Sequence, residues 1–133
     1  MTRKPKRSLV FFIDRSLGGR IVAEALREAG AHVETHDSHF AQDTPDVDWL
    51  REVGRRGWIV LSKDEAILRH PVEREMLDAA NVRAFFLTKQ AMTGPEMAAL
   101  FVRVLRAMAN RAISQPAPFI YTISRFGHFT RVR

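Results

Sequence analysis

Residues 8–13 read Ser-Leu-Val-Phe-Phe-Ile, and the next residue is Asp14. An apolar run of this length that ends at a charged residue is typical of a strand buried on both faces of a parallel sheet. A second run of the same kind, Trp58-Ile-Val-Leu-Ser62, is followed by Lys63 and Asp64. Both runs predict central strands, each with an aspartate close behind its carboxyl end.

Helical patterns alternate with these strands along the chain. Thr44 and Pro45 are typical of an N-cap and a first helical residue, and the helix that they open is expected to end at Gly57. Thr93-x-x-Glu96 is a capping box that opens the helix with the clearest apolar face. The strands are expected at residues 8–13, 32–36, 58–62, 82–87 and 119–123.

Strands that alternate with helices predict a three-layer α/β/α sandwich around a central parallel sheet. The two most apolar strands belong in the middle and the polar strand at 32–36 belongs at an edge, which gives a strand order near 2-1-3-4-5. In such sheets, ligands bind beyond the carboxyl ends of the strands, where the strand order reverses. We expect one domain at 8–124, a basic N-terminal arm at 1–7 and a basic, aromatic C-terminal tail at 125–133.

The length and composition are typical of a globular domain. The chain has 133 residues, of which 46% are hydrophobic and 27% charged, and this excludes a mostly disordered chain. The absence of cysteine excludes a disulfide framework and a thiolate metal site. The apolar runs near the start are too short for a signal peptide or a membrane-spanning helix. We therefore expect a cytoplasmic protein with no membrane contact.

The charge is unevenly distributed. Lys and Arg number 21 against 15 Asp and Glu, which gives a formal net charge of +6. Residues 37–48 nevertheless hold four Asp and no Lys or Arg. The basic remainder favours a polyanionic partner such as nucleic acid or an acidic protein. The acidic segment is either a solvated loop or a source of carboxylates for a metal ion.

Three to five carboxylates are expected to converge at the predicted ligand-binding edge of the sheet, which we call the acidic edge. Their oxygens select Mg²⁺ or Mn²⁺ over zinc, and such an ion would remove the repulsion between like charges. Asp46 and Asp48 also have a structural interpretation, because acidic residues stabilise a helix start, and Asp64 could cap a turn. His36 and His39 suggest zinc, but no third soft ligand is evident. The candidate ligands are Asp14, Asp37, Asp46, Asp48 and Asp64.

Over roughly residues 8–90, the chain resembles the PIN-like nucleases in the order and spacing of four segments. Within this family, the chain is most similar to the toxins of VapBC-type toxin–antitoxin pairs, particularly the VapC45-like group. The segments that carry the resemblance are Phe12-Ile-Asp-Arg-Ser-Leu17, Val33-Glu-Thr-His-Asp37, Pro45-Asp-Val-Asp-Trp-Leu50 and Val60-Leu-Ser-Lys-Asp64.

This resemblance implies a metal-dependent endoribonuclease that uses Mg²⁺ or Mn²⁺. Asp14, Asp46 and Asp64 then take the family's catalytic acidic positions. The glutamate that larger PIN domains add has no match in this chain, and Asp37 and Asp48 are the candidates to replace it. The implied partners are RNA, an antitoxin protein and a second copy of the chain in a homodimer.

Basic side chains near the acidic edge and in the tail are candidates for RNA contact. They are Arg15, Lys63, Arg125 and Arg131. In the tail, arginines interleave with Phe126 and Phe129, and single-stranded nucleic acid is bound by cations along its backbone and aromatic faces under its bases. The alternative is that these two rings pack on the sheet edge or against a second copy.

Two other functions remain open. The chain could be a PIN-like interaction module without catalysis, or a receiver-like domain that accepts a phosphoryl group on Asp64. Receivers share the expected strand order and carry a Thr or Ser after the fourth strand, where this chain has Thr88. They also carry paired acids after the first strand and a lysine after the fifth, whereas here Asp14 is followed by Arg15 and the later position holds Arg125.

Overall fold

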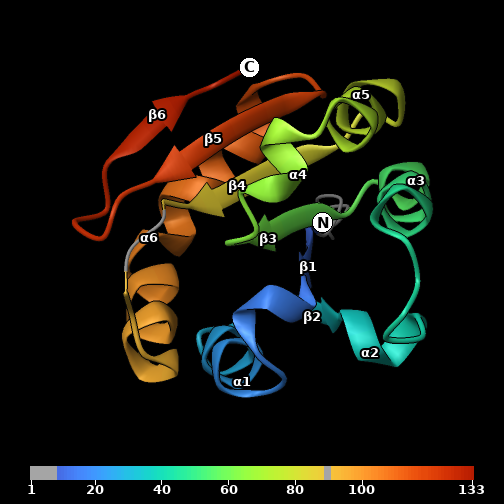
Figure 1. The fold of residues 1–133 in the computed structure, drawn as a ribbon. Helices are drawn as coiled ribbons and strands as arrows, with labels where there is room; N and C mark the ends of the chain where they lie inside the picture. The colour runs from blue at the N-terminus through green and yellow to red at the C-terminus, as the bar shows by residue number, and fades with distance from the viewer. Residues whose placement is uncertain (1–8, 89–90) are drawn as a thin grey trace, which may run out of the picture.

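A computed structural model describes residues 9–88 and 91–133, so the predicted basic arm at 1–7 lies outside the described residues. One six-stranded sheet in the order β2-β1-β3-β4-β5-β6 has helices on both faces (Figure 1). The strands are β1 (Val10–Ile13), β2 (His32–Thr35), β3 (Ile59–Ser62), β4 (Arg83–Leu87), β5 (Phe119–Ile123) and β6 (Phe129–Arg131). The helices are η1 (Arg15–Leu17), α1 (Ile21–Glu28), α2 (His36–His39), α3 (Asp46–Arg56), α4 (Ala66–Arg69), α5 (Pro71–Ala79) and α6 (Gly94–Ser114).

The first five strands are parallel, and the predicted order 2-1-3-4-5 is confirmed. Successive residues of β1 point to opposite faces of the sheet, as the period of a strand requires. Phe11 and Ile13 belong to the core that packs against α1 and α6, while Phe12 belongs to the core that packs against α3, α4 and α5. This two-sided burial is why the strand is apolar at every position. None of the helices in the described part of the chain is long and apolar enough to cross a bilayer.

The start of α3 differs by one residue from the expectation. The backbone N–H of Asp48 donates to the Pro45 carbonyl at 3.0 Å, so Pro45 is the N-cap residue and Thr44 precedes the helix. The Thr44 carbonyl instead accepts a hydrogen bond from Arg15 at 3.2 Å. The predicted capping box of α6 is confirmed, because the Thr93 side chain and the Glu96 backbone pair, as do the Glu96 side chain and the Thr93 backbone.

The sheet is mixed rather than wholly parallel, because a sixth strand lies within the segment 125–133 that was expected to be a tail. β6 pairs antiparallel with β5, with Phe129 opposite Ile123. After the strand, the Arg133 guanidinium forms a salt bridge of 2.5 Å with Asp78, next to the end of α5. The end of the chain is therefore part of the fold.

Close packing of α3 on α5 leads to a stability prediction. A Cβ added at Gly54 in α3 would overlap the carbonyl oxygen of Ala80 and lie 2.7 Å from its Cβ. The two helices would have to separate, so Gly54→Ala should lower the free energy of unfolding by about 1–3 kcal/mol in urea denaturation. Gly19→Ala is the matched control, because nothing lies within 4 Å of its new Cβ. Equal stability of the two variants would contradict this prediction.

Candidate active site

Asp14 is a buried carboxylate at the carboxyl end of β1. Asp14 is 2% exposed to solvent. Its backbone N–H donates to the Leu61 carbonyl at 3.0 Å, which extends the pairing of β1 with β3. One carboxylate oxygen, Oδ2, accepts hydrogen bonds from the hydroxyls of Ser62 at 2.7 Å and Ser16 at 2.8 Å. The backbone and two hydroxyls therefore fix this side chain in one place.

The surroundings of Asp14 disfavour its negative charge. Burial raises the pKa of Asp14, the hydroxyls of Ser62 and Ser16 oppose that rise, and the charges of Asp46 and Asp64 add to it. The net effect is a pKa above the ordinary value of 3.8. Two neighbouring carboxylates that raise the proton affinity of Asp14 indicate a place where a cation is favourable.

Ser62 links Asp14 to Asp64. Its hydroxyl is fully buried at the end of β3, donates to Asp14 and accepts from the backbone N–H of Asp64 at 2.9 Å. Asp64 in turn accepts a hydrogen bond on Oδ1 from the Ala66 N–H at 3.1 Å, so it caps the turn into α4. The structural interpretation of Asp64 is therefore correct for one of its two oxygens.

Asp46 reaches the same edge from the first turn of α3. Its Oδ1 accepts hydrogen bonds from the Arg15 guanidinium at 3.0 Å and from the indole N–H of Trp49 at 2.8 Å. Arg15 also donates to the backbone carbonyls of Gln42 and Thr44. Arg15, which the sequence proposed for RNA contact, thus ties the acidic segment to the carboxyl end of β1.

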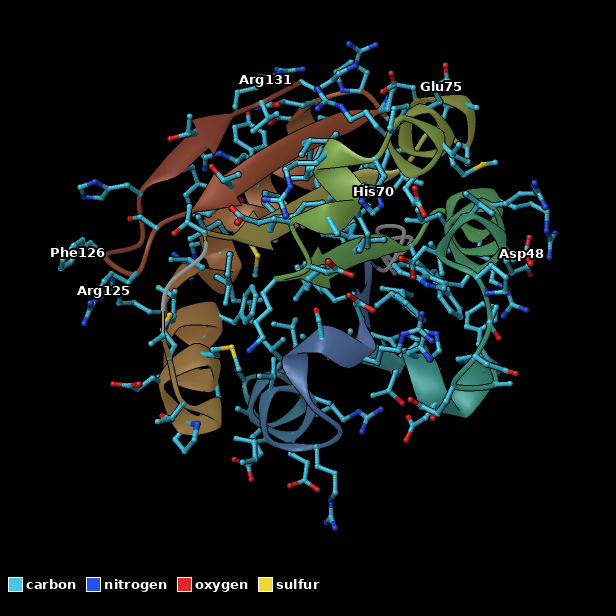
Figure 2. The ribbon with its side chains drawn as sticks, in the orientation of Figure 1. Asp48, His70, Glu75, Arg125, Phe126 and Arg131 are labelled. Atoms are coloured by element: carbon cyan, nitrogen blue, oxygen red, sulfur yellow. The ribbon has the colours of Figure 1, made fainter. Side chains whose placement is uncertain are left out.

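Asp37 and Asp48, the two candidates for the fourth acidic position, lie in different surroundings. Asp37 accepts a hydrogen bond from the Thr35 hydroxyl at 2.8 Å and lines a pocket of about 120 Å³ beside Arg15. Asp48 is exposed on the outer side of α3, 3.6 Å from Arg51 (Figure 2). Neither is among the charges that raise the pKa of Asp14.

His36 is buried beneath this edge of the sheet. Its ring packs against Phe12, Phe40 and Trp49, and neither ring nitrogen has a hydrogen-bond partner within residues 9–88 and 91–133. Burial, and then the charge of Arg15, lower the pKa of His36. The other histidine that suggested zinc, His39, pairs instead with Glu34 at 2.7 Å.

The donor chemistry of the edge fits a hard divalent cation. Asp14 retains Oδ1, and Asp46 and Asp64 each retain Oδ2, as oxygens that accept no hydrogen bond from residues 9–88 or 91–133. Within these same residues, no three His, Asp or Glu side chains are grouped closely enough to hold an ion as they stand. The aspartates supply the right atoms, while Arg15 and Trp49 occupy one oxygen of Asp46.

Sequence reasoning overlooked the hydroxyls that position Asp14. Ser16 and Ser62 stand two residues after Asp14 and two residues before Asp64, respectively. A small hydroxyl residue at the end of an otherwise apolar strand was the available indication for Ser62. The position of Ser16 follows from η1, a turn that the sequence analysis did not expect.

Comparisons with known proteins show which family the chain resembles. A family model described as "PIN like domain" matches residues 9–89, which include every residue of the acidic edge described above. The chain is 35% identical over 129 residues to a Mycobacterium tuberculosis protein named "Putative ribonuclease VapC45", and the alignment covers 90% of this chain and 93% of that protein. No solved structure gave a significant match. The chain belongs to the PIN-like domain family.

Proposed function

We propose that the protein is a Mg²⁺- or Mn²⁺-dependent endoribonuclease that acts as the toxin of a toxin–antitoxin pair. The observation that carries the proposal is the buried Asp14 carboxylate, whose pKa is raised by burial and by the charges of Asp46 and Asp64. The ribonuclease name of the Mycobacterium relative supports the same activity. RNA would be the substrate, the cytoplasm the place of action, and an antitoxin and a second copy of the chain the protein partners.

In this proposal, each residue of the edge has a distinct role. Asp14, Asp46 and Asp64 would hold the ion through the oxygens that accept no hydrogen bond from the described residues, with Asp37 as a further ligand through water. Asp48, on the outer side of α3 beside Arg51, would not reach the ion. A bound divalent cation would lower the pKa of a water and neutralise charge on the scissile phosphate. Ser16 and Ser62 hold Asp14, and Arg15 holds Asp46, so these three are positioning residues. Lys63 and Arg125 remain candidates to contact phosphate.

Metal dependence is the decisive test of this function. The purified protein should cut a single-stranded RNA oligonucleotide in Mn²⁺ or Mg²⁺, and excess EDTA should abolish the cut because the carboxylates alone supply no activated water. Denaturing gel electrophoresis with a 5′-labelled RNA measures both the rate and the position of the cut. Restoring Mn²⁺ after EDTA should restore cleavage, which separates metal removal from loss of fold.

The same assay decides between the proposed enzyme and a PIN-like interaction module. A protein that binds Mn²⁺ or RNA but cuts no RNA under any metal would be the non-catalytic module. The receiver-like interpretation receives no support from the family to which the chain belongs.

A further inference from the structure

The loop between β5 and β6 presents an aromatic ring to solvent. Phe126 is 69% exposed, the largest exposed fraction among the exposed large hydrophobic residues in the described part of the chain. Figure 2 shows Phe126 and Arg125 at the outer end of this loop, pointing away from the body of the protein. Single exposed apolar residues are common on protein surfaces, so the meaning of this ring depends on how it is held and on what surrounds it.

The exposure is built into the loop rather than caused by a frayed chain end. The Ser124 hydroxyl accepts hydrogen bonds from the backbone N–H groups of Phe126 and His128, each at 3.2 Å. Gly127 turns the chain with a φ of 84°, and its N–H donates to the Ser124 carbonyl at 2.8 Å. From α6, Arg103 donates to the Phe126 carbonyl at 2.6 Å. These contacts hold the Phe126 ring in an outward position.

Two guanidinium groups lie at this loop, one of them beside the ring. The Arg125 guanidinium lies 5.6 Å from the centre of the Phe126 ring. Arg103 and Arg125 also line an adjoining hollow of about 290 Å³ against α6. Among the described residues that line this hollow, Glu96 is the acidic one. An aromatic face beside two guanidinium groups matches a partner that carries flat apolar rings on an anionic backbone.

The loop lies on the same edge of the sheet as the carboxylates. β5 runs parallel to the strands that precede Asp14 and Asp64, so its carboxyl end opens onto the same side. β3 and β4 separate β1 from β5, and three strand spacings amount to about 14 Å along the edge. An RNA strand with its scissile phosphate at Asp14 could therefore reach the loop within a few nucleotides.

We propose that Phe126, flanked by Arg103 and Arg125, is a platform on which a base of single-stranded RNA stacks while the arginines contact its phosphates. This inference rests on the proposed function for its ligand. The other aromatic residue of the segment, Phe129, packs against Phe85 and Tyr121 in the fold. Arg131 is likewise engaged, with the side chain of Gln115 at 3.2 Å. The segment that the sequence treats as one RNA-binding tail thus divides into a structural strand and an exposed tip.

Fluorescence anisotropy with a labelled 12-nucleotide RNA in EDTA tests the platform without requiring cleavage. Phe126→Ala should weaken binding by about 5- to 150-fold, the loss expected for one stacked base. Phe126→Leu should lose as much, because it keeps apolar bulk without an aromatic face, whereas Phe126→Trp should retain affinity. Ile113→Ala is the matched control, since Ile113 is also exposed, at 62%. It lies at the carboxyl end of α6, whereas the hollow with Arg103 lies against the first half of that helix. Circular dichroism melts should show that all four variants remain folded.

The remaining outcomes separate a failure of the platform from a failure of the proposed catalysis. Wild-type RNA affinity in Phe126→Ala would show that the ring does not stack on RNA. If that variant also changed the oligomeric state in analytical ultracentrifugation, the tip would be an interface between copies. A wild-type protein that binds the RNA through Phe126 but cuts none in Mn²⁺ would refute the proposed catalysis and leave the platform standing.

Discussion

Asp14→Asn should reduce Mn²⁺-dependent RNA cleavage by two or more orders of magnitude, equivalent to about 3 kcal/mol or more in the activation barrier. Asparagine keeps the shape of the side chain and an oxygen that can accept from Ser16 and Ser62, but it removes the charge that would hold the ion. Single-turnover rates on a labelled RNA with saturating enzyme measure the chemical step. Saturating Mn²⁺ should not restore the rate, because the lost carboxylate would also orient the ion.

The matched control makes the same chemical change elsewhere in the acidic surroundings. Asp43→Asn replaces an exposed aspartate of the segment 37–48 that no part of the proposed site uses. It should cut RNA at the wild-type rate. Unchanged cleavage by Asp14→Asn would place the active site elsewhere on the molecule.

Although Asp14→Asn should reduce cleavage, it should stabilise the fold when metal is removed. The pKa of Asp14 is raised on folding, so the folded state binds its proton more tightly than the unfolded state does. Any stabilising effect of Asp14 is thus present below the ordinary pKa of 3.8 and is lost as the pH rises through the raised value. At pH 7 in EDTA, Asp14→Asn should resist urea better than the wild type, and this advantage should shrink as the pH is lowered. A less stable variant at pH 7 would contradict the assigned electrostatics.

The arrangement of the sheet could be predicted because apolar burial is a local property of the sequence. β3 is buried at all four positions, and its sequence Ile-Val-Leu-Ser is apolar up to the last residue. β2 carries an exposed His32 and a half-buried Glu34, which marks an edge. β6 offered no such pattern, since it has three residues and two of them are exposed. Its position depends on pairing with β5, which no local pattern contains.

In the candidate site, the aspartates at the strand ends could be predicted from the sequence. Which aspartate of α3 faces them could be predicted less well. Asp14 and Asp64 follow two strands that burial places side by side, and the charges of Asp46 and Asp64 act on Asp14. Asp48 stands two residues after Asp46, and two residues turn a helix by about 200°, so the two side chains point in nearly opposite directions. The role of Arg15 could not be predicted, because its hydrogen bonds to Gln42, Thr44 and Asp46 span 27, 29 and 31 residues.

Phe12→Ala should be among the most destabilising substitutions, with a loss of about 3–5 kcal/mol in the free energy of unfolding. Phe12 is fully buried, and its ring centre lies 5.4 Å from that of Trp49 and 6.2 Å from that of His36. Truncation leaves a cavity beneath the ring cluster, which close-packed neighbours fill only in part. Urea denaturation at low temperature measures the loss, and Phe12→Leu should recover part of it.

The cavity left by Phe12→Ala should also affect the proposed site. It lies against Trp49, whose indole N–H donates to Asp46. Phe85→Ala provides the matched comparison: Phe85 is equally buried among aromatic rings, but in the core on the opposite face of the sheet. Both variants should lose similar stability. Only Phe12→Ala should then weaken Mn²⁺ binding in calorimetric titration of the folded protein, because only it loosens the indole that orients the Asp46 carboxylate. Equal Mn²⁺ affinities in the two variants would mean that Arg15 alone is sufficient to position Asp46.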